Sequence, residues 1–274
     1  MNNIEIDFWG VRGSVPSPGP KTAKYGGNTS CLEVRCGENL LIFDAGTGIK
    51  ELAADITFGE PLNADLFLSH THLDHVCGLP FFEPLFRGDT KLRIWGGHLS
   101  PDRKIYDVLQ SLMRDPLWPV QLEDMQADIT FCDFLAGDVL RPTIDITIKT
   151  VALNHPNGAT GYRINYKNKS ICYITDTEHF ADRIDQDILQ LISNSDILIY
   201  DSTYTPEDYP NRVGWGHSTW NEGVKLAITG NVKKFVVFHH NPDHSDVEMD
   251  LIAKEVAKVM PNAVVAREGM KLCP

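Results

Sequence analysis

One short stretch of the chain gathers four side chains that are able to bind a metal ion. His70, His72, Asp74 and His75 lie within six residues, in the pattern H-x-H-x-D-H, directly after the apolar residues 66–68. A regular helix or strand cannot point all four at one place, whereas a turn leaving a strand can. Imidazole nitrogens and carboxylate oxygens suit zinc, manganese or iron. Ordinary surface turns favour Gly, Asn, Asp and Ser and have no need of imidazoles, so the stretch predicts a metal site.

Residues of the same chemical types also follow other predicted strands. Apolar runs and alternation predict strands at residues 4–8, 31–35, 40–43, 66–68, 92–95, 144–153, 162–166, 171–174, 197–200 and 235–238. Potential ligands stand at the ends of six of them, namely Asp44, His70, His155, Asp176, Asp201 and His239. A lone histidine in such a place is usually structural, but this recurrence predicts one edge where loops converge into a functional site.

Helices are predicted between the strands from capping residues and apolar periodicity. Ser100 followed by Pro101 is typical of a helix start, and the pairs at 219–222 and 245–248 fit capping boxes. Strands with interspersed helices, twice over, predict sheets that are covered by helices.

The composition is ordinary for a soluble enzyme and has an acidic balance. The 274 residues are 42% hydrophobic and 23% charged, which is ample for a sizeable core. The net charge of −12 argues against binding of long nucleic acid, which usually requires a basic surface. No secretory leader or membrane-spanning run is visible. Since the six cysteines are scattered and form no C-x-x-C, we expect thiols and a cytoplasmic protein.

Two loops rich in glycine could line the predicted site. They cover residues 9–20 and 25–30, and glycine lets a backbone approach a ligand closely, although ordinary turns are an equal alternative. Arg12 in the first loop could receive a phosphate or lie in solvent. Trp118 and Trp215 could stack on a base, but we favour burial in the core.

Over essentially its whole length the chain resembles the metallo-β-lactamase superfamily of binuclear metallohydrolases. The H-x-H-x-D-H motif is the most specific part of this resemblance, and the later ligand types follow in the order expected of the superfamily. Residues 10–14, 25–30, 175–177 and 216–219 resemble its phosphodiesterase branch, which includes ribonuclease Z. The resemblance implies an α/β fold, a four-layer αββα sandwich that forms a single domain over residues 1–274.

The resemblance also implies two divalent metal ions, for which we expect zinc, with manganese or iron as alternatives. One ion would take His70, His72 and His155, the other would take Asp74, His75 and His239, and Asp176 would bridge them. His240 competes with His239, which we favour because it directly follows the strand at 235–238. Asp44 would either cap a helix or orient a metal-bound histidine, and the role of Asp201 is left open.

The implied activity is that of a metal-dependent hydrolase acting on a phosphodiester. A hydroxide that bridges the metals would attack phosphorus, while the metals neutralise charge on the phosphate oxygens. Asp74 could orient the nucleophile as well as bind metal, and His217 is the candidate general acid for the leaving oxygen. The structural alternative for His217 is a histidine at a helix start.

Several substrate classes are compatible with these residues. We expect a small or cyclic nucleotide or a sugar cyclic phosphate, with no membrane partner and a homodimer left open. The alternative is a ribonuclease Z-like endonuclease acting at the 3′ end of transfer RNA, although the chain lacks the Gly- and Lys-rich arm with which that family often reaches transfer RNA. A thioester or lactam hydrolase would share the metal ligands, and a metal-dependent binding protein without turnover fits them least.

Overall fold

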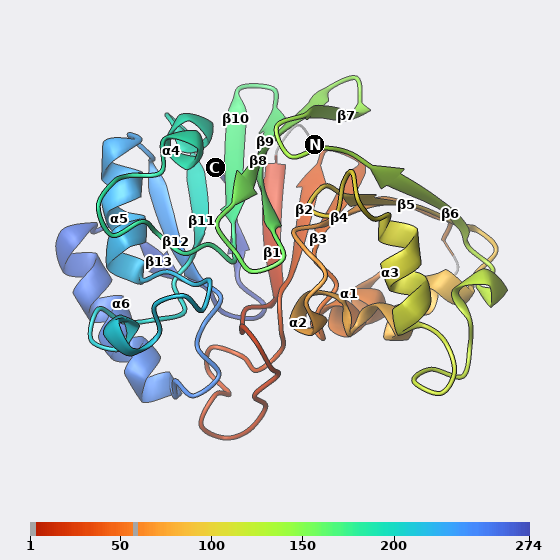
Figure 1. Cartoon of the computed structure of the whole chain (residues 1–274), viewed down its shortest axis with the longest axis horizontal. Coiled ribbons are helices and arrows are strands. Elements are labelled where there is room, and N and C mark those ends of the chain that lie inside the picture. The colour runs from red at the N-terminus through yellow and green to blue at the C-terminus, as the bar shows by residue number, and fades with distance from the viewer. Residues whose placement is uncertain (1–3, 57–59) are drawn as a thin grey trace.

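Two seven-stranded sheets lie face to face at the centre of the computed structural model, which describes residues 4–56 and 60–274 (Figure 1). The first sheet contains β1 (Ile4–Gly10), β2 (Cys31–Cys36), β3 (Asn39–Phe43), β4 (Leu62–Leu68), β5 (Thr90–Gly96), β6 (Asp128–Asp133) and β14 (Lys271–Leu272). The second contains β7 (Val139–Thr143), β8 (Ile146–Leu153), β9 (Ala159–Tyr166), β10 (Lys169–Ile174), β11 (Ile197–Asp201), β12 (Lys234–Phe238) and β13 (Val264–Val265).

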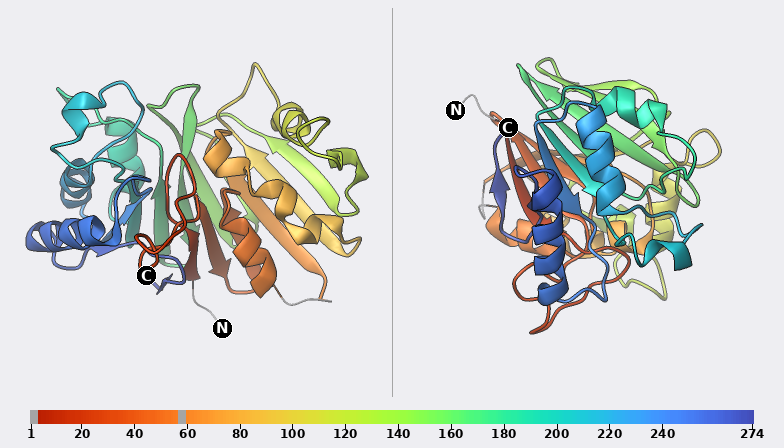
Figure 2. Two further views of the ribbon diagram at one scale, coloured as in Figure 1. Left: turned by 90° about the horizontal axis from the view of Figure 1, so that it is seen from below. Right: turned by 90° about the vertical axis from the view of Figure 1, so that its left-hand side faces the viewer.

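Helices cover the outer face of each sheet. The first sheet carries α1 (Ile49–Asp55), α2 (Leu73–Val76) and α3 (Ile105–Leu112), and the second carries α4 (Gln186–Ile192), α5 (Trp220–Thr229) and α6 (Asp246–Val259). The left view of Figure 2 shows this layering of helices, sheet, sheet and helices. This arrangement confirms the predicted αββα sandwich.

Each sheet contains a run of four neighbouring parallel strands. The first sheet runs β14-β1-β2-β3-β4-β5-β6 and the second β13-β12-β11-β10-β9-β8-β7. Strands β3 to β6 are parallel, as are β10 to β13. Because the carboxyl ends of parallel strands meet at one edge of a sheet, the loops after β3, β4, β10, β11 and β12 can contribute to one site.

Three hydrophobic clusters hold the four layers together. The largest lies between the sheets and includes Phe8, Phe43, Tyr162 and Phe238. The other two lie between each sheet and its helices, where the alternation of each strand presents a second apolar face. Buried aromatic rings extend across the inner layer, with the centroids of Phe43 and Tyr162 5.5 Å apart. The sheets are therefore a rigid support for the loops at their edge.

The helix starts show where local sequence signals were sufficient and where they were not. Ser245 forms the predicted capping box of α6, and the Thr219 side chain accepts from the backbone N–H of Glu222 at the start of α5. The predicted start at Ser100 is wrong, because α3 begins at Ile105. The Ile105 N–H instead donates to the carboxylate of Asp133 (2.8 Å), so a distant residue on β6 takes the place of a local cap.

Two further predictions concern the chain as a whole. Each of the six cysteines is a free thiol in the described structure, as expected. Among residues 4–56 and 60–274, no helix is long and apolar enough to cross a membrane.

Candidate metal centre

The first sheet brings four of the predicted ligands to its edge. His70 and His72 lie in the loop after β4, and Asp74 and His75 lie in the short helix α2. Nε2 of His75 is 3.2 Å from Oδ2 of Asp74. The turn between strand and helix thus directs side chains of the H-x-H-x-D-H stretch into one region, as the spacing predicted.

The second sheet contributes three more of the predicted residues from the facing side. His155 follows β8, Asp176 follows β10 and His239 follows β12. Nε2 of His155 lies 3.0 Å from Nδ1 of His72, and Nε2 of His239 lies 3.3 Å from Nε2 of His75. The candidate centre is therefore formed only where the edges of the two sheets meet.

Asp176 lies between two groups of potential ligands. Its Oδ1 is 3.7 Å from Nε2 of both His70 and His155, whereas its Oδ2 is 3.2 Å from Nε2 of His75 and 3.3 Å from Nε2 of His239. Ligand atoms of His70, His72 and His155 lie within 4.8 Å of one another, as do those of Asp74, His75, Asp176 and His239. One carboxylate thus faces both groups, which is the arrangement that a bridging ligand requires.

Backbone strain accompanies three of the residues that follow strands. Asp44, Asp176 and His239 have φ values of 61°, 55° and 60°. Residues other than glycine avoid this left-handed region, and such strain persists where the surrounding structure imposes it, often at functional sites. The tight exit from each strand turns these side chains toward the common edge.

Asp44 orients His75 and does not cap α1, whose N-cap is Gly48. The fully buried carboxylate of Asp44 accepts from Nδ1 of His75 at 2.8 Å. It also accepts from the Ser69 backbone N–H and from the hydroxyls of Ser69 and Tyr173, at 2.7 to 2.8 Å. Nδ1 of His75 therefore carries a proton, and Nε2 is directed at Asp176, where its lone pair would bind a metal when the ring is neutral.

His155 and His239 are held in the same manner, each through its Nδ1 atom. Nδ1 of His155 donates to the carbonyl of Gly216 (2.7 Å), and Nδ1 of His239 lies 2.9 Å from Oγ1 of Thr203. His240 points elsewhere, since its Nε2 donates to the carbonyl of Ala266. The structure thus brings His239 and not His240 into the group.

His217 is paired with Asp201, whose role the sequence left open. Nδ1 of His217 donates to Oδ2 of the fully buried Asp201 (2.9 Å) and lies 3.8 Å from Oδ1 of Asp176. Asp201 also accepts from the backbone N–H groups of Thr177 and Thr203. A carboxylate on Nδ1 fixes the ring and leaves Nε2 outside that pair.

Burial and neighbouring charges shift the ionisation of the centre in opposite directions. Burial lowers the pKa of His70 well below its ordinary value, so the ring is neutral. Burial alone would lower the pKa of His217, but Asp201 and other carboxylates raise it to about 9. Burial acts to raise the pKa of Asp176, yet the surrounding imidazoles lower it well below its usual range. Asp176 is therefore a carboxylate among imidazoles.

The first glycine-rich loop lies against the centre, as one of the two interpretations predicted. The Ser14 N–H donates to Oδ2 of Asp74 (2.7 Å), and a Cβ on Gly13 would lie 2.3 Å from Cε1 of His239. Both interpretations of Arg12 are wrong. This side chain is fully buried, and its guanidinium donates to the carbonyls of Gly26, Asn241 and His244. It joins the loop to the segment after β12.

Other aromatic and histidine residues lie around the centre. Trp215 is 60% exposed, so the prediction that it is buried is wrong, whereas Trp118 packs against the cluster under the first sheet. Nε2 of His98 lies 3.0 Å from Oγ1 of Thr71, the residue that separates the predicted ligands His70 and His72 in the sequence. Nδ1 of His179 lies within hydrogen-bonding distance (2.9 Å) of Oγ of Ser218, the residue after His217. These contacts join residues far apart in the chain, so the sequence carries no signal for them.

The residues at the centre fit a binuclear metal site. Nε2 of His70 is buried and has no hydrogen-bond partner among the described residues, although burying such an atom alone is unfavourable. The donors are imidazole nitrogens and carboxylate oxygens, which bind zinc and similar divalent cations. The second ring nitrogens of His75, His155 and His239 are occupied by protein partners, as is usual around metal ligands.

Comparison with known proteins agrees with the fold and the site. The family described as "Beta-lactamase superfamily domain" matches residues 40–240. The ribonuclease Z of Picrophilus torridus is 25% identical, over 98% of this chain and 96% of its own length. Among solved structures, the metallo-β-lactamase fold protein YhfI from Bacillus subtilis has a TM-score of 0.73 at 19% identity, with 100% of both chains covered. A diphosphatase from the PhnP family has a TM-score of 0.69 at 18% identity, covering 98% and 97%.

The chain therefore belongs to the metallo-β-lactamase superfamily, as its motifs predicted. Its similarity to ribonuclease Z along nearly the whole chain agrees with the predicted branch of that superfamily and with a hydrolase. The two solved structures are too distant in sequence to show more than the shared fold.

Proposed function

We propose that the protein is a binuclear metal-dependent phosphodiesterase acting on a small or cyclic nucleotide or a sugar cyclic phosphate. The observation that carries this proposal is the position of Asp176, with one oxygen toward His70 and His155 and the other toward His75 and His239. Carboxylates in such positions hold two cations close together, the arrangement that suits displacement at phosphorus.

Seven residues would hold the two cations. His70, His72 and His155 would bind one, Asp74, His75 and His239 would bind the other, and Asp176 would bind both. We propose zinc, because nitrogen-rich sets of this kind suit it, with manganese or iron as alternatives. When bound, the cations would supply a water of lowered pKa and would neutralise the phosphate charge.

The pair of His217 and Asp201 would assist the leaving group. Asp201 holds Nδ1 of His217, so the other ring nitrogen can hold a proton for the leaving oxygen. Asp74 is itself held by the Ser14 N–H, so its carboxylate can orient the attacking water while it binds metal. Departure of an alkoxide requires an acid more than departure of a thiolate does, and this favours a phosphodiester over a thioester.

Three substrate classes are compatible with these metal ligands, and they differ in size and in the bond that is cleaved. The net charge of −12 supports a small substrate, because long nucleic acid is bound chiefly through basic surfaces. The relatives named ribonuclease Z support the second candidate, an endonuclease acting on transfer RNA precursors. A thioester or lactam hydrolase is the third, since it would use the same metal ligands.

Metal content and hydrolysis of bis(p-nitrophenyl) phosphate test the proposal together. We expect about two metals per chain, with activity strongly reduced in Asp74→Ala. His217→Ala should retain both metals but hydrolyse a cyclic nucleotide, whose leaving group is an alkoxide, about a hundredfold more slowly; full activity of this variant on the cyclic nucleotide would end its assignment as the acid. Two metals without diester hydrolysis would favour thioester or lactam substrates, and no tightly bound metal would refute the proposal. Cleavage of a transfer RNA precursor in preference to cyclic nucleotides would establish the second candidate.

A further inference from the structure

Large apolar side chains are exposed next to the metal centre on three separate segments of the chain. Val15, Leu73 and Trp215 are each more than half exposed. Val15 follows the residue whose N–H binds Asp74, Leu73 stands between two predicted ligands, and Trp215 is two residues before His217. Single exposed apolar residues are common, whereas several beside one site mark a binding surface. Part of the substrate next to the reacting phosphate is therefore expected to be apolar.

Backbone contacts place Trp215 beside the centre. The carbonyl of the next residue, Gly216, accepts from Nδ1 of His155 at 2.7 Å. A Cβ on Gly216 would lie 2.5 Å from the same nitrogen, so the backbone passes directly against this predicted ligand. Because each residue spans at most about 3.6 Å, the Cα atoms of Trp215 and His217 are separated by no more than about 7 Å. The indole is thus attached next to both a predicted metal ligand and the candidate acid.

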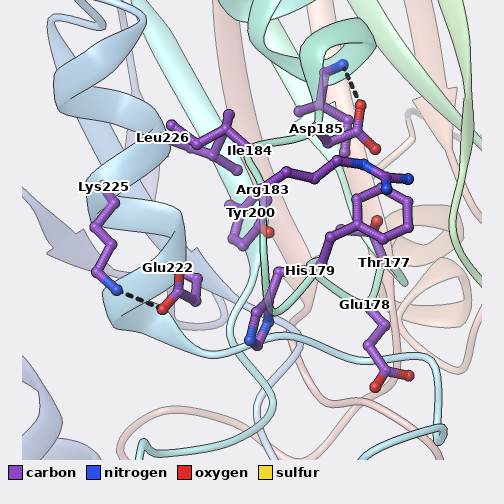
Figure 3. A pocket seen from close by; sticks show the side chains of 12 residues that line it. Thr177, Glu178, His179, Arg183, Ile184, Asp185, Tyr200, Glu222, Lys225 and Leu226 are labelled. Atoms are coloured by element: carbon purple, nitrogen blue, oxygen red, sulfur yellow. Dashed lines mark hydrogen bonds and ion pairs between the residues drawn. The ribbon is translucent and has the colours of Figure 1, made fainter.

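One carboxylate holds the loop that carries Trp215. The hydroxyl of Tyr209 and the Gly214 N–H donate to Oε1 of Glu178, at 2.9 and 2.7 Å. The Gly216 N–H donates to Oε2 of the same carboxylate at 2.9 Å. Figure 3 shows this carboxylate well apart from the basic side chains drawn there, so its partner is the loop. Because the N–H groups on both sides of Trp215 are bound, the loop requires little ordering when a ligand arrives.

The indole of Trp215 has a cation over its ring and is otherwise largely open. Cζ of Arg212 lies 4.9 Å from the ring centroid, and the Trp215 N–H donates to the Arg212 carbonyl at 3.1 Å. This cation–π contact fixes the ring and brings a positive charge to a place where an anionic substrate binds. Since Trp215 is 60% exposed, much of the ring surface is free for stacking. Nucleobases stack on such aromatic surfaces with little dependence on base identity.

We propose that Trp215 is a stacking platform for the base of the substrate, which makes the substrate a nucleotide and not a sugar cyclic phosphate. This inference rests on the proposed function and narrows its substrate class. The base would stack on the indole while the phosphate lies at the two cations and His217 serves the leaving oxygen. A sugar phosphate without a base would leave the indole unused.

Calorimetric titration of the zinc-loaded protein with two phosphate monoesters tests the platform without turnover. Adenosine 5′-monophosphate and ribose 5-phosphate carry the same phosphate ester, but only the first has a base. Stacking of one base changes affinity by about 5- to 150-fold, so wild type should bind the nucleotide about tenfold more tightly. Trp215→Ala should remove this difference and leave the affinity for ribose 5-phosphate unchanged. Trp215→Phe retains an aromatic face and should keep most of it.

A control variant on the same loop separates stacking from a general disturbance. Val213 is also exposed there, and Val213→Ala should bind both monoesters like wild type. Loss of fold or of metal would lower both affinities together, so their ratio reports the platform alone. Equal affinities in wild type, a ratio unchanged in Trp215→Ala, or failure of zinc-loaded wild type to bind either monoester would overturn the platform.

Hydrolysis of adenosine 2′,3′-cyclic phosphate distinguishes this inference from the proposed function. Trp215→Ala should raise KM about tenfold and keep kcat within about twofold, as expected for a group that binds ground state and transition state alike. An active enzyme whose KM is the same in Trp215→Ala would overturn the platform and leave the proposed function standing. A protein that hydrolyses no diester but keeps the affinity ratio dependent on Trp215 would overturn the proposed function and retain the base site.

Discussion

Replacement of Asp44 by asparagine should weaken metal binding without any change in the metal ligands. Oδ2 of Asp44 accepts from Nδ1 of His75 at 2.8 Å and from the hydroxyls of Ser69 and Tyr173. The asparagine amide has one oxygen for two N–H donors that Asp44 binds with separate oxygens, so its nitrogen would face either the Nδ1–H of His75 or the Ser69 backbone N–H, donor against donor. His75 can accept from the amide only by moving its proton to Nε2, which removes the lone pair directed at the candidate centre.

The magnitude follows from this change of tautomer. Loss of a partner that orients a metal-bound histidine typically costs 10–100-fold in metal affinity, or about 1.4–2.7 kcal/mol. The fold should also lose stability, since each buried hydrogen bond to a charged group contributes about 1.5–3 kcal/mol. The hydroxyls of Ser69 and Tyr173 can rotate to accept from the amide, so the folded state should survive.

Competition titration with a chelator measures the affinity for zinc, and urea unfolding measures the stability. Asp65→Asn is the matched control, because Asp65 is a buried carboxylate on β4 that accepts from Arg93 and Trp95. Both variants should lose stability, but only Asp44→Asn should lose zinc affinity. A folded Asp44→Asn protein that binds zinc as tightly as wild type would refute the reasoning about the tautomer.

Three further outcomes follow from the structure. Gly13→Ala would place Cβ 2.3 Å from the His239 ring, so zinc affinity should fall about tenfold, whereas Gly88→Ala, where no atom lies within 4 Å, should not change it. Arg12→Met would leave three carbonyls without their donor and should lower the free energy of unfolding in urea by about 3 kcal/mol; a loss below about 0.5 kcal/mol would contradict this. Burial acts to raise the pKa of Asp196, but the ammonium of a neighbouring lysine lowers it below its ordinary value. The stability of wild type relative to Asp196→Asn should therefore be greatest near pH 7 and decline as the pH falls below about 4, and a difference that is constant with pH would refute it.

The central elements could be predicted because local pattern and burial agree there. Residues 66–68 of β4, 197–200 of β11 and 235–238 of β12 are continuous apolar runs buried on both faces, and a polar residue follows each of them. The edge strands β6 and β7 were not predicted. In β6 the alternation is short, with only Ile129 and Phe131 between polar residues, and β7 contains Pro142, which argues against a strand, so neither sequence gives a strong signal.

The identity of the site residues was more accessible to prediction than their supports. Donor types and spacing identify His70 or Asp176 because metal chemistry restricts which side chains can serve. The partners of those residues come from distant segments, as Tyr173 does for Asp44, and tyrosines are common in any core. Arg12 shows the same limit, since only the folded structure reveals that three carbonyls converge on its guanidinium.

The candidate centre lies between the two sheets, so it forms only when both halves of the molecule are folded and packed together. The first sheet and its loops supply His70, His72, Asp74 and His75, and the second supplies His155, Asp176 and His239. Neither half alone is a receptor for a pair of cations. A cation chelated by both would act as a removable cross-link, and its binding free energy would add to the cohesion of the two sheets. The lifetime of the folded chain against proteolysis would then depend on the supply of metal in its surroundings, before any substrate is present.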